Sequence, residues 1–278
     1  MHNNEYSKNS LLSDKDFKKY KINKNILKYL FLSYAKSKKK RSEFKVLDYG
    51  CGKGRSVFLL QKLGFDVHGV DIDESVIINS KAYFKSKKAF HSLTVLDSEF
   101  KTKYEDETFD FIFSSQVFEH ISDISGVTKE ISRISKNGSS HFHVFPSKYH
   151  IFEAHLGMPL VHWLPKNLIR YLAIYFFVLI GLEPKWSELK QRNISQRVDE
   201  YYNYSTEKTF YRNISVIKHN FSNNNFISRL VYPKSLSFFS FYRKNSLFSR
   251  MIIFVLSRFV SVNLLSIKKN NLKAKFRS

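Results

Sequence analysis

The order of apolar and polar positions predicts strands that alternate with helices over residues 44–147. Short apolar runs, typical of buried strands, are each followed by a segment whose apolar residues recur every three to four positions. The predicted strands are 45–48, 67–70, 93–96, 109–114 and 140–145, and the predicted helices are 55–63, 74–85 and 124–134. The "KNG" sequence at 136–138 predicts the end of the last helix. Such alternation is typical of βαβ units, so we expect a parallel sheet with right-handed crossovers.

The residues before this alternation predict a helical extension. Apolar residues between Leu11 and Tyr34 follow helical spacing, which indicates two short helices, and the polar run "KSKKKRSE" follows as a connector. The first 25 residues are polar and contain no apolar run of the kind found in secretory signals. We therefore expect no cleaved signal peptide.

Beyond Pro146 the alternation stops. An irregular segment rich in histidine and aromatic residues leads to an apolar helix at 167–182, which is shorter than the roughly 20 residues that a membrane span needs. This helix is therefore predicted to be buried or to lie at an interface. Residues 187–204 are polar. Further elements are predicted as a helix at 206–220, a strand at 226–232, an apolar helix with flanking arginines at 246–260 and a basic tail.

The positive charge lies at the two ends of the chain. The formal net charge is +22, yet residues 46–204 contain 19 basic and 19 acidic residues. The excess is confined to residues 1–45, with 13 Lys and Arg against 4 Asp and Glu, and to residues 205–278, with 14 against 1. These ends are predicted to contact an anionic partner, either a membrane surface or a phosphorylated substrate. The single cysteine, Cys51, excludes an intramolecular disulfide and suits a reducing compartment.

Three of the nine glycines lie within five positions, Gly50, Gly52 and Gly54, directly after the first predicted strand. Glycine lets such a loop turn sharply and lets a ligand pack on its backbone. The G-x-G-x-G spacing matches neither the dinucleotide-binding nor the P-loop pattern. Asp71 ends the second predicted strand, 21 residues after Gly50, where an acid accepts hydrogen bonds from a ribose, and Asp73 is its nearest substitute. A ribose-bearing ligand without a pyrophosphate fits these residues.

Five segments occur in order, namely "VLDYGCGKG", "VHGVDID", "LTVLDSEF", "FDFIFSSQVFEHI" and "EISRISKNGSSHFHVFPS". Together they resemble class I S-adenosylmethionine-dependent methyltransferases of the group that includes the ubiquinone-type O-methyltransferases. The resemblance covers about residues 44–147. It departs from the family at Lys53, where a small residue is common, and at "KNGSSHFH", which lacks the usual proline and second glycine.

The resemblance implies an α/β, Rossmann-like three-layer sandwich with a mostly parallel seven-stranded sheet. Its last two strands are expected near 226–232 and 267–276. The predicted regions are an N-terminal helical extension (1–43), the cofactor-binding core (44–147), a helical substrate-recognition insertion after strand five (148–204) and a C-terminal completion of the sheet (205–278). Resemblance assigns Gly50, Cys51 and Gly52 to the methionine part of S-adenosylmethionine, Asp71 to the ribose, Asp97 and Ser98 to the adenine, and Gln116 to the methyl group. Asp48 and Ile72 complete the predicted cofactor-binding set.

Methyl transfer to a hydroxyl requires alignment of the acceptor and removal of a proton. The candidates for proton removal are Glu119, His120, His143, His150, Glu153, His155 and His162. His120, Glu153 and His155 are the predicted catalytic residues. In the ubiquinone-type enzymes the segment that matches "QVFEH" carries acids and a histidine linked to a divalent metal, whereas this chain has Gln116 in place of an acid. A divalent metal is therefore left open, and no metal ligand is predicted.

The leading hypothesis is an O-methyltransferase for a small or lipid-linked hydroxylated acceptor, a sugar or a quinone-like ring. Trp163 would suit the face of a sugar, and the apolar helices with basic flanks would suit a lipid carrier at a membrane. An RNA or protein methyltransferase is the alternative, although the C-terminal basic residues flank apolar segments rather than interleaving with aromatic residues as in nucleic-acid sites. A non-catalytic binding module is a third hypothesis. We expect a cytoplasmic protein, peripheral at the inner face of the membrane if its acceptor is lipid-linked.

Overall fold

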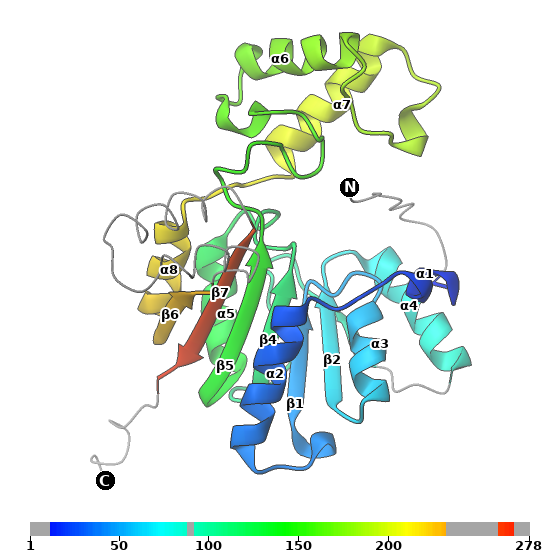
Figure 1. Cartoon of the computed structure of the whole chain (residues 1–278). Coiled ribbons are helices and arrows are strands. Elements are labelled where there is room, and N and C mark those ends of the chain that lie inside the picture. The colour runs from blue at the N-terminus through cyan, green and yellow to red at the C-terminus, as the bar shows by residue number, and fades with distance from the viewer. Residues whose placement is uncertain (1–11, 88–91, 232–260, 270–278) are drawn as a thin grey trace, which may run out of the picture.

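A computed structural model describes residues 12–87, 92–231 and 261–269, and its centre is a seven-stranded sheet (Figure 1). The strand order is β3-β2-β1-β4-β5-β7-β6. The first five strands run parallel, whereas β7 is antiparallel to both β5 and β6. Their bounds are β1 Lys45–Tyr49, β2 Asp66–Asp71, β3 Leu93–Val95, β4 Phe109–Ser115, β5 Ser135–Phe145, β6 Phe226–Leu230 and β7 Val262–Lys268.

Helices cover both faces of this sheet and make a three-layer sandwich. One apolar core packs α2 (Lys24–Ser37), α3 (Arg55–Lys62) and α4 (Glu74–Ser86) against one face. A second core packs α5 (Ile124–Ile134) and α8 (Ile214–Asn223) against the other. Because the strands are buried on both faces, their sequences read as continuous apolar runs. The predicted α/β class and its three layers are confirmed.

The predicted position of the last strand is wrong. Residues 267–276 were expected to form it, but β7 spans Val262–Lys268 and places Leu264 and Leu265 in the core. The sheet therefore takes the more apolar segment before the basic tail, although Asn263, Ser266 and Lys268 of this strand are buried as well. The predicted apolar helix at 246–260 and the tail at 270–278 lie outside the described residues.

The predicted helix at 206–220 is also wrong, because two helices share this region. Helix α7 spans Ile194–Glu207, within the segment that was read as merely polar, and α8 begins at Ile214. The amide of Phe210 donates to the carbonyl oxygen of Glu119 at 2.6 Å, so the residues between the helices bond to the connection between β4 and α5 rather than to a helical turn.

The fifth strand begins earlier than expected, at Ser135, and includes the "KNG" turn signal. Its register against β4 shifts between Phe109 and Phe111, where two residues of β4 meet a longer stretch of β5. Gly138 in this stretch has a φ of +76°. The glycine therefore allows an irregular strand rather than only the end of a helix.

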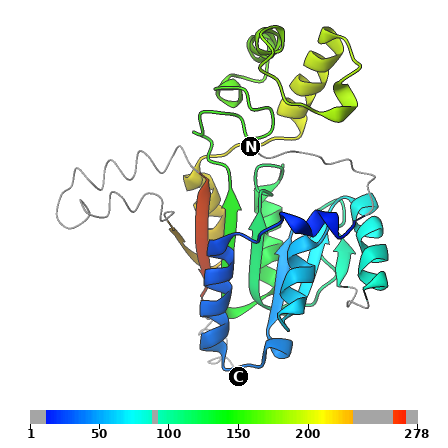
Figure 2. The same ribbon diagram turned by 45° about the vertical axis from the view of Figure 1, so that its right-hand side comes forward.

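Residues 148–207 form a lobe above the carboxyl ends of the parallel strands (Figures 1 and 2). The lobe contains η2 (Val161–Trp163), α6 (Leu168–Leu179), η3 (Ser187–Leu189) and α7. It has an apolar core of its own, to which Met158, Ile174 and Tyr201 contribute. The short helices α1 (Lys15–Lys18) and η1 (Arg41–Glu43) precede the sheet. Among the described helices, none has both the length and the apolar character to cross a membrane.

Candidate functional site

The glycine loop follows β1 and is tied to the neighbouring strand. The amides of Gly50 and Cys51 both donate to the carbonyl oxygen of Val70, at 2.8 and 2.9 Å. Gly50 has a φ of +80°, and a Cβ there would lie 2.3 Å from a methyl carbon of Val117, so only glycine fits. Gly52 has a φ of +50°, but no described atom lies within 4 Å of the point that its Cβ would occupy. The loop therefore exposes bare backbone to open space at Gly52, as a ligand cradle requires.

Asp71 lies at the end of β2 and faces this loop. Its Oδ2 accepts a hydrogen bond from the amide of Gly52 at 2.7 Å, and its Oδ1 accepts one from the amide of Asp73 at 3.1 Å. Burial raises the pKa of the Asp71 carboxyl, while these amides oppose the rise. The predicted substitute, Asp73, instead accepts from the amide of Val76 and caps α4. Asp71 is therefore the acid in contact with the glycine loop.

The other predicted cofactor residues lie along the same edge of the sheet. Asp48 is buried beneath the loop, where burial first and the charge of Asp71 second raise its pKa to about 8. Ile72 is 53% exposed beside Asp71. Past β3 and β4 the exposed residues are Asp97, Ser98 and Gln116. Asp48 lies inside β1, one residue before its end, and the other positions follow the carboxyl ends of parallel strands, where ligands bind in open α/β sheets.

The N-terminal extension covers part of the glycine loop. Lys53, the residue that departs from the family pattern, is only 7% exposed, and its Nζ lies 3.6 Å from a carboxylate oxygen of Asp16. The hydroxyl groups of Tyr20 and Ser56 are 2.5 Å apart, which adds a second contact between the extension and the start of α3. A lysine is thus accommodated in the loop because the extension supplies a partner for its charge.

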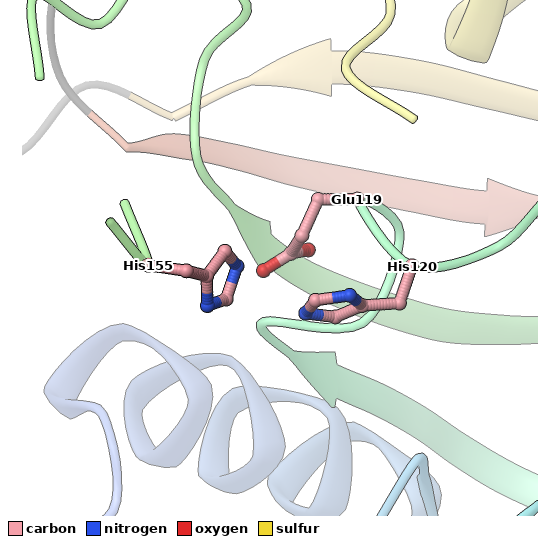
Figure 3. Close-up of side chains that lie close together, drawn as sticks. All are labelled: Glu119, His120 and His155. Atoms are coloured by element: carbon pink, nitrogen blue, oxygen red, sulfur yellow. The ribbon is translucent and has the colours of Figure 1, made fainter. Parts of the chain in front are cut away.

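A second group of polar side chains, Glu119, His120 and His155, lies beyond the ends of β4 and β5 (Figure 3). Glu119 and His120 come from the connection between β4 and α5, and His155 comes from the lobe. One potential ligand atom from each side chain lies within 4.8 Å of the other two, and the two imidazole centroids are 4.7 Å apart. Tertiary structure thus joins residues that are 35 positions apart in sequence.

Glu119 is a buried acid without a counter-charge in this group. Neither of its carboxylate oxygens has a hydrogen-bond partner among the described residues. Burial raises its pKa to about 8, so the isolated carboxyl is mostly protonated at neutral pH. A buried carboxyl of this kind gains stability when a cation or a donor reaches it.

His120 is oriented by the connector between α7 and α8. Its Nδ1 donates to the carbonyl oxygen of Lys208 at 2.7 Å, which leaves the lone pair of the neutral ring on Nε2. Burial first, and then the neighbouring His155, lower the pKa of His120. The charge of Asp71 also acts on this ring, so the group lies within electrostatic range of the glycine loop. A neutral imidazole near neutral pH can accept a proton.

Unlike His155, Glu153 does not belong to the group that contains Glu119 and His120. Its Oε2 accepts from the amide of His155 at 2.7 Å, and its Oε1 accepts from the hydroxyl of Tyr211 at 2.5 Å. Both oxygens are thus occupied in holding the loop that carries His155. Of the wider candidates, His143 is buried inside the sheet against Ser114, and the His150 imidazole donates to its own loop at Phe152.

Sequence reasoning left Glu119 outside the predicted catalytic set. The signal available was an acid inside the apolar stretch "VFEHI", next to a histidine at the end of a buried strand. The position of Tyr211 could not have been found in this way, because it contacts Glu153 only through the fold.

Two imidazole nitrogens and one carboxylate are a donor set for a divalent ion such as Zn²⁺, Mn²⁺ or Fe²⁺. Glu119, His120 and His155 fit such an ion, since the carboxylate has no other partner and Nδ1 of His120 is already fixed by a backbone carbonyl. Gln116, which stands in place of an acid, is exposed, and the group described above does not include it.

We expect Co²⁺ to bind this group and to give the visible absorption typical of nitrogen and oxygen ligands. Glu119→Gln should weaken the binding at least ~10-fold, because an amide oxygen carries no charge to offset the cation. The measurement is a spectroscopic titration of the purified protein. Glu188→Gln, at an exposed acid of η3, is the matched control. Equal affinities of wild type and Glu119→Gln would refute this assignment.

A comparison with family models matches residues 47–142 to the methyltransferase domain family. This range begins in β1, ends in β5 and includes the glycine loop, Asp71, Glu119 and His120. His155 and the lobe lie outside it. The match therefore covers the cofactor edge and about a third of the chain.

The individual proteins to which this chain is similar are also methyltransferases. The chain is 31% identical over 96 residues to the sterol 24-C-methyltransferase of Aspergillus fumigatus and 26% identical over 133 residues to the ubiquinone biosynthesis O-methyltransferase of Rickettsia conorii. These matches cover 34% and 47% of this chain but only 26% and 45% of the two relatives. The geranyl diphosphate C-methyltransferase of Streptomyces coelicolor, solved with Mg²⁺, geranyl diphosphate and S-adenosyl-L-homocysteine, shares the fold, with a TM-score of 0.50, 10% identity, and coverage of 87% of this chain and 77% of that one.

Proposed function

We propose, since residues 47–142 form a class I methyltransferase domain, that the protein transfers the methyl group of S-adenosylmethionine to a hydroxyl oxygen. The acceptor is a small or lipid-linked hydroxylated molecule, a sugar or a quinone-like ring. The observation that carries the proposal is the adjacency of two sites. The glycine loop with Asp71 lies at the carboxyl edge of the sheet, and the group of Glu119, His120 and His155 lies beside it at the same edge.

The residues of the first site fit S-adenosylmethionine. At Gly52 the bare backbone leaves open space in which the methionine part of the cofactor can pack against the loop, while the Gly52 amide stays bonded to Asp71. Asp71 offers a carboxylate to the two ribose hydroxyls, and Ile72 offers an exposed apolar side chain to the adenine. No pyrophosphate-binding spacing is present in the loop, which agrees with a nucleoside cofactor that lacks phosphates.

The second site supplies what an oxygen acceptor requires. The acceptor oxygen attacks the methyl carbon in line with the carbon–sulfur bond, a new carbon–oxygen bond forms, and S-adenosylhomocysteine leaves with the electron pair on sulfur. The hydroxyl proton passes to Nε2 of His120, which carries the lone pair of the neutral ring. His155 lies at a centroid distance of 4.7 Å from His120, whereas Glu119 is mostly protonated at neutral pH and does not accept the proton.

Glu119, His120 and His155 would also hold a divalent ion beside the acceptor. The ion, when bound, would lower the pKa of the acceptor hydroxyl. The two schemes are alternatives for His120, because its Nε2 can take the hydroxyl proton only when it does not bind an ion. In both schemes the three side chains orient the acceptor oxygen.

The names of the relatives favour a small acceptor over a polymer. One relative is named for ubiquinone biosynthesis and another for a sterol, and neither name refers to a polymer. The lobe that follows β5 adds exposed Trp163, an aromatic ring that can stack on a sugar or a quinone-like ring. These features support a hydroxylated, partly apolar acceptor.

The proposal is tested with S-adenosylmethionine labelled in its methyl group and an extract separated into lipid, glycan, small-molecule and nucleic-acid fractions. We expect label in the lipid, glycan or small-molecule fraction. Label confined to RNA or protein would favour the alternative polymer methyltransferase. Absence of cofactor binding in calorimetry would contradict methyl transfer itself and favour a non-catalytic module.

A further inference from the structure

We propose that the outer face of α6 docks on a lipid surface with anionic headgroups. The face consists of apolar side chains at 168, 169, 172, 175, 176, 179 and 180, which recur at helical spacing on one side of the helix. Leu168 is 68% exposed, and Leu172 and Phe176 are each 56% exposed. The inference rests on this surface and not on methyl transfer.

Exposed apolar side chains are concentrated in this lobe. Of the 21 large exposed apolar side chains in the described ranges, 13 lie between Ile151 and Ile194. Scattered exposed apolar residues are normal, whereas a continuous apolar patch marks a site of interaction with a protein or a membrane. Tyr175 lies on the α6 face, and the exposed Trp163 precedes the helix in the same lobe. Both are aromatic types that are enriched at membrane–water interfaces.

The opposite side of α6 faces the core of the lobe. Ile174 and Val178 are buried there, together with the one charged residue of the helix, Arg170. Its guanidinium donates to the carbonyl oxygens of Leu164 and Ser205 and is turned away from the outer face. The exposed side of α6 is therefore uncharged because its only cation is used inside the lobe.

The charge around the face selects lipid over a second copy of the chain. Residues 154–182 contain no Asp or Glu, and the exposed Lys185 follows the C-terminal end of α6. Lys166, before the helix, instead donates to the carbonyl oxygens of Thr206 and Thr209. Glu183 follows the helix, but its carboxylate lies 3.2 Å from the guanidinium of Arg197. The net charge of +22 lies outside residues 46–204, so it does not act at the face itself, but it draws the whole chain toward an anionic bilayer and disfavours contact between two such chains.

The dimensions of α6 favour a position in the plane of the interface. Twelve residues make a helix about 18 Å long, which is too short to cross the hydrocarbon layer. One side of α6 is exposed and apolar and the other side is buried, as in helices that lie in the plane of a membrane interface. The lobe stands on the same side of the sheet as the proposed active site (Figure 1), so docking through α6 would bring that site close to a membrane-bound acceptor.

The test is co-sedimentation of the whole protein with vesicles of phosphatidylcholine containing 30% phosphatidylserine, and with phosphatidylcholine alone. We expect binding to the anionic vesicles that weakens as salt is added, because surface charges are screened. The double variant Leu172→Glu, Phe176→Glu should lower the vesicle-bound fraction at least ~10-fold. Ile78→Glu, at a residue of α4 that is 57% exposed, is the matched control and should bind as the wild type does.

Three outcomes would overturn the proposal. Equal vesicle binding by the wild type and the double variant would exclude the α6 face. The second is a wild type that binds no vesicles and forms a dimer in sedimentation velocity, while the double variant is a monomer. That result would identify the face as a contact between copies. A wild-type protein that binds no vesicles and remains a monomer would exclude a lipid surface as the partner of this face. Circular dichroism and cofactor calorimetry on each variant separate these outcomes from misfolding and from failure of the proposed activity.

Discussion

Asp71→Ala is expected to weaken the binding of S-adenosylmethionine by about 10- to 100-fold. A hydrogen bond that involves a charged group contributes about 1.5–3 kcal/mol, and alanine removes the carboxylate that would accept from the ribose. The substitution also removes the acceptor of the Gly52 amide, which holds the loop in position at 2.7 Å. Isothermal titration calorimetry of the purified protein measures the change.

Asp66→Ala is the matched control for this experiment. Asp66 begins the same strand that Asp71 ends, so it lies at the opposite edge of the sheet and pairs there with His68. We expect its cofactor affinity to equal that of the wild type. An Asp71→Ala protein that binds the cofactor as tightly as the wild type would show that the ribose assignment is incorrect.

His120→Gln is expected to reduce turnover by about 10²- to 10⁴-fold without changing the affinity for S-adenosylmethionine. Proton transfer by a positioned side chain contributes a factor of this size, and an amide cannot accept the proton. Glutamine keeps a polar side chain of similar length, so the bond to the carbonyl oxygen of Lys208 can be replaced. The measurement is single-turnover transfer of labelled methyl to the acceptor fraction that the wild type labels.

His219→Gln provides the comparison, since His219 is exposed on α8 and bonds to Asn223 of the same helix. It should leave turnover unchanged. If His120→Gln and His155→Gln both transferred methyl at the wild-type rate, neither imidazole would be the base. Acceptor alignment alone would then account for catalysis, as in in-line transfers that need no proton removal.

The cofactor edge of the molecule could be predicted from the sequence because its signals are local. The glycines at 50, 52 and 54 need particular backbone angles, and β1, β2 and β4 are apolar runs that only a doubly covered sheet buries. Since parallel strands end at one edge, the residues that follow them had to converge there. The boundaries of α5, Ile124–Ile134, agree with the prediction to the residue.

The second site could not be predicted in this way. His120 and His155 belong to segments with separate local signals, and their approach depends on the lobe folding back over the sheet. That approach is held by long-range bonds, from Tyr211 to Glu153 and from Phe210 to the backbone of Glu119. No periodicity records such contacts, because each joins residues more than 50 positions apart.

Beyond β5, too, the sequence predicts some features, and others depend on tertiary contacts. The apolar character of α6 is plain in the sequence, but the sequence could not say which of its faces is covered, since the helix is apolar nearly all round. Burial of Arg170 against two backbone carbonyls decides that question. By itself the sequence determined the glycine loop, the acid that ends the second strand and the presence of a parallel sheet, because glycine conformation and apolar burial act over a few neighbouring residues. Only the tertiary structure decided the Glu119, His120 and His155 group, the place of β7 and the exposed face of α6, because each depends on contacts between distant segments.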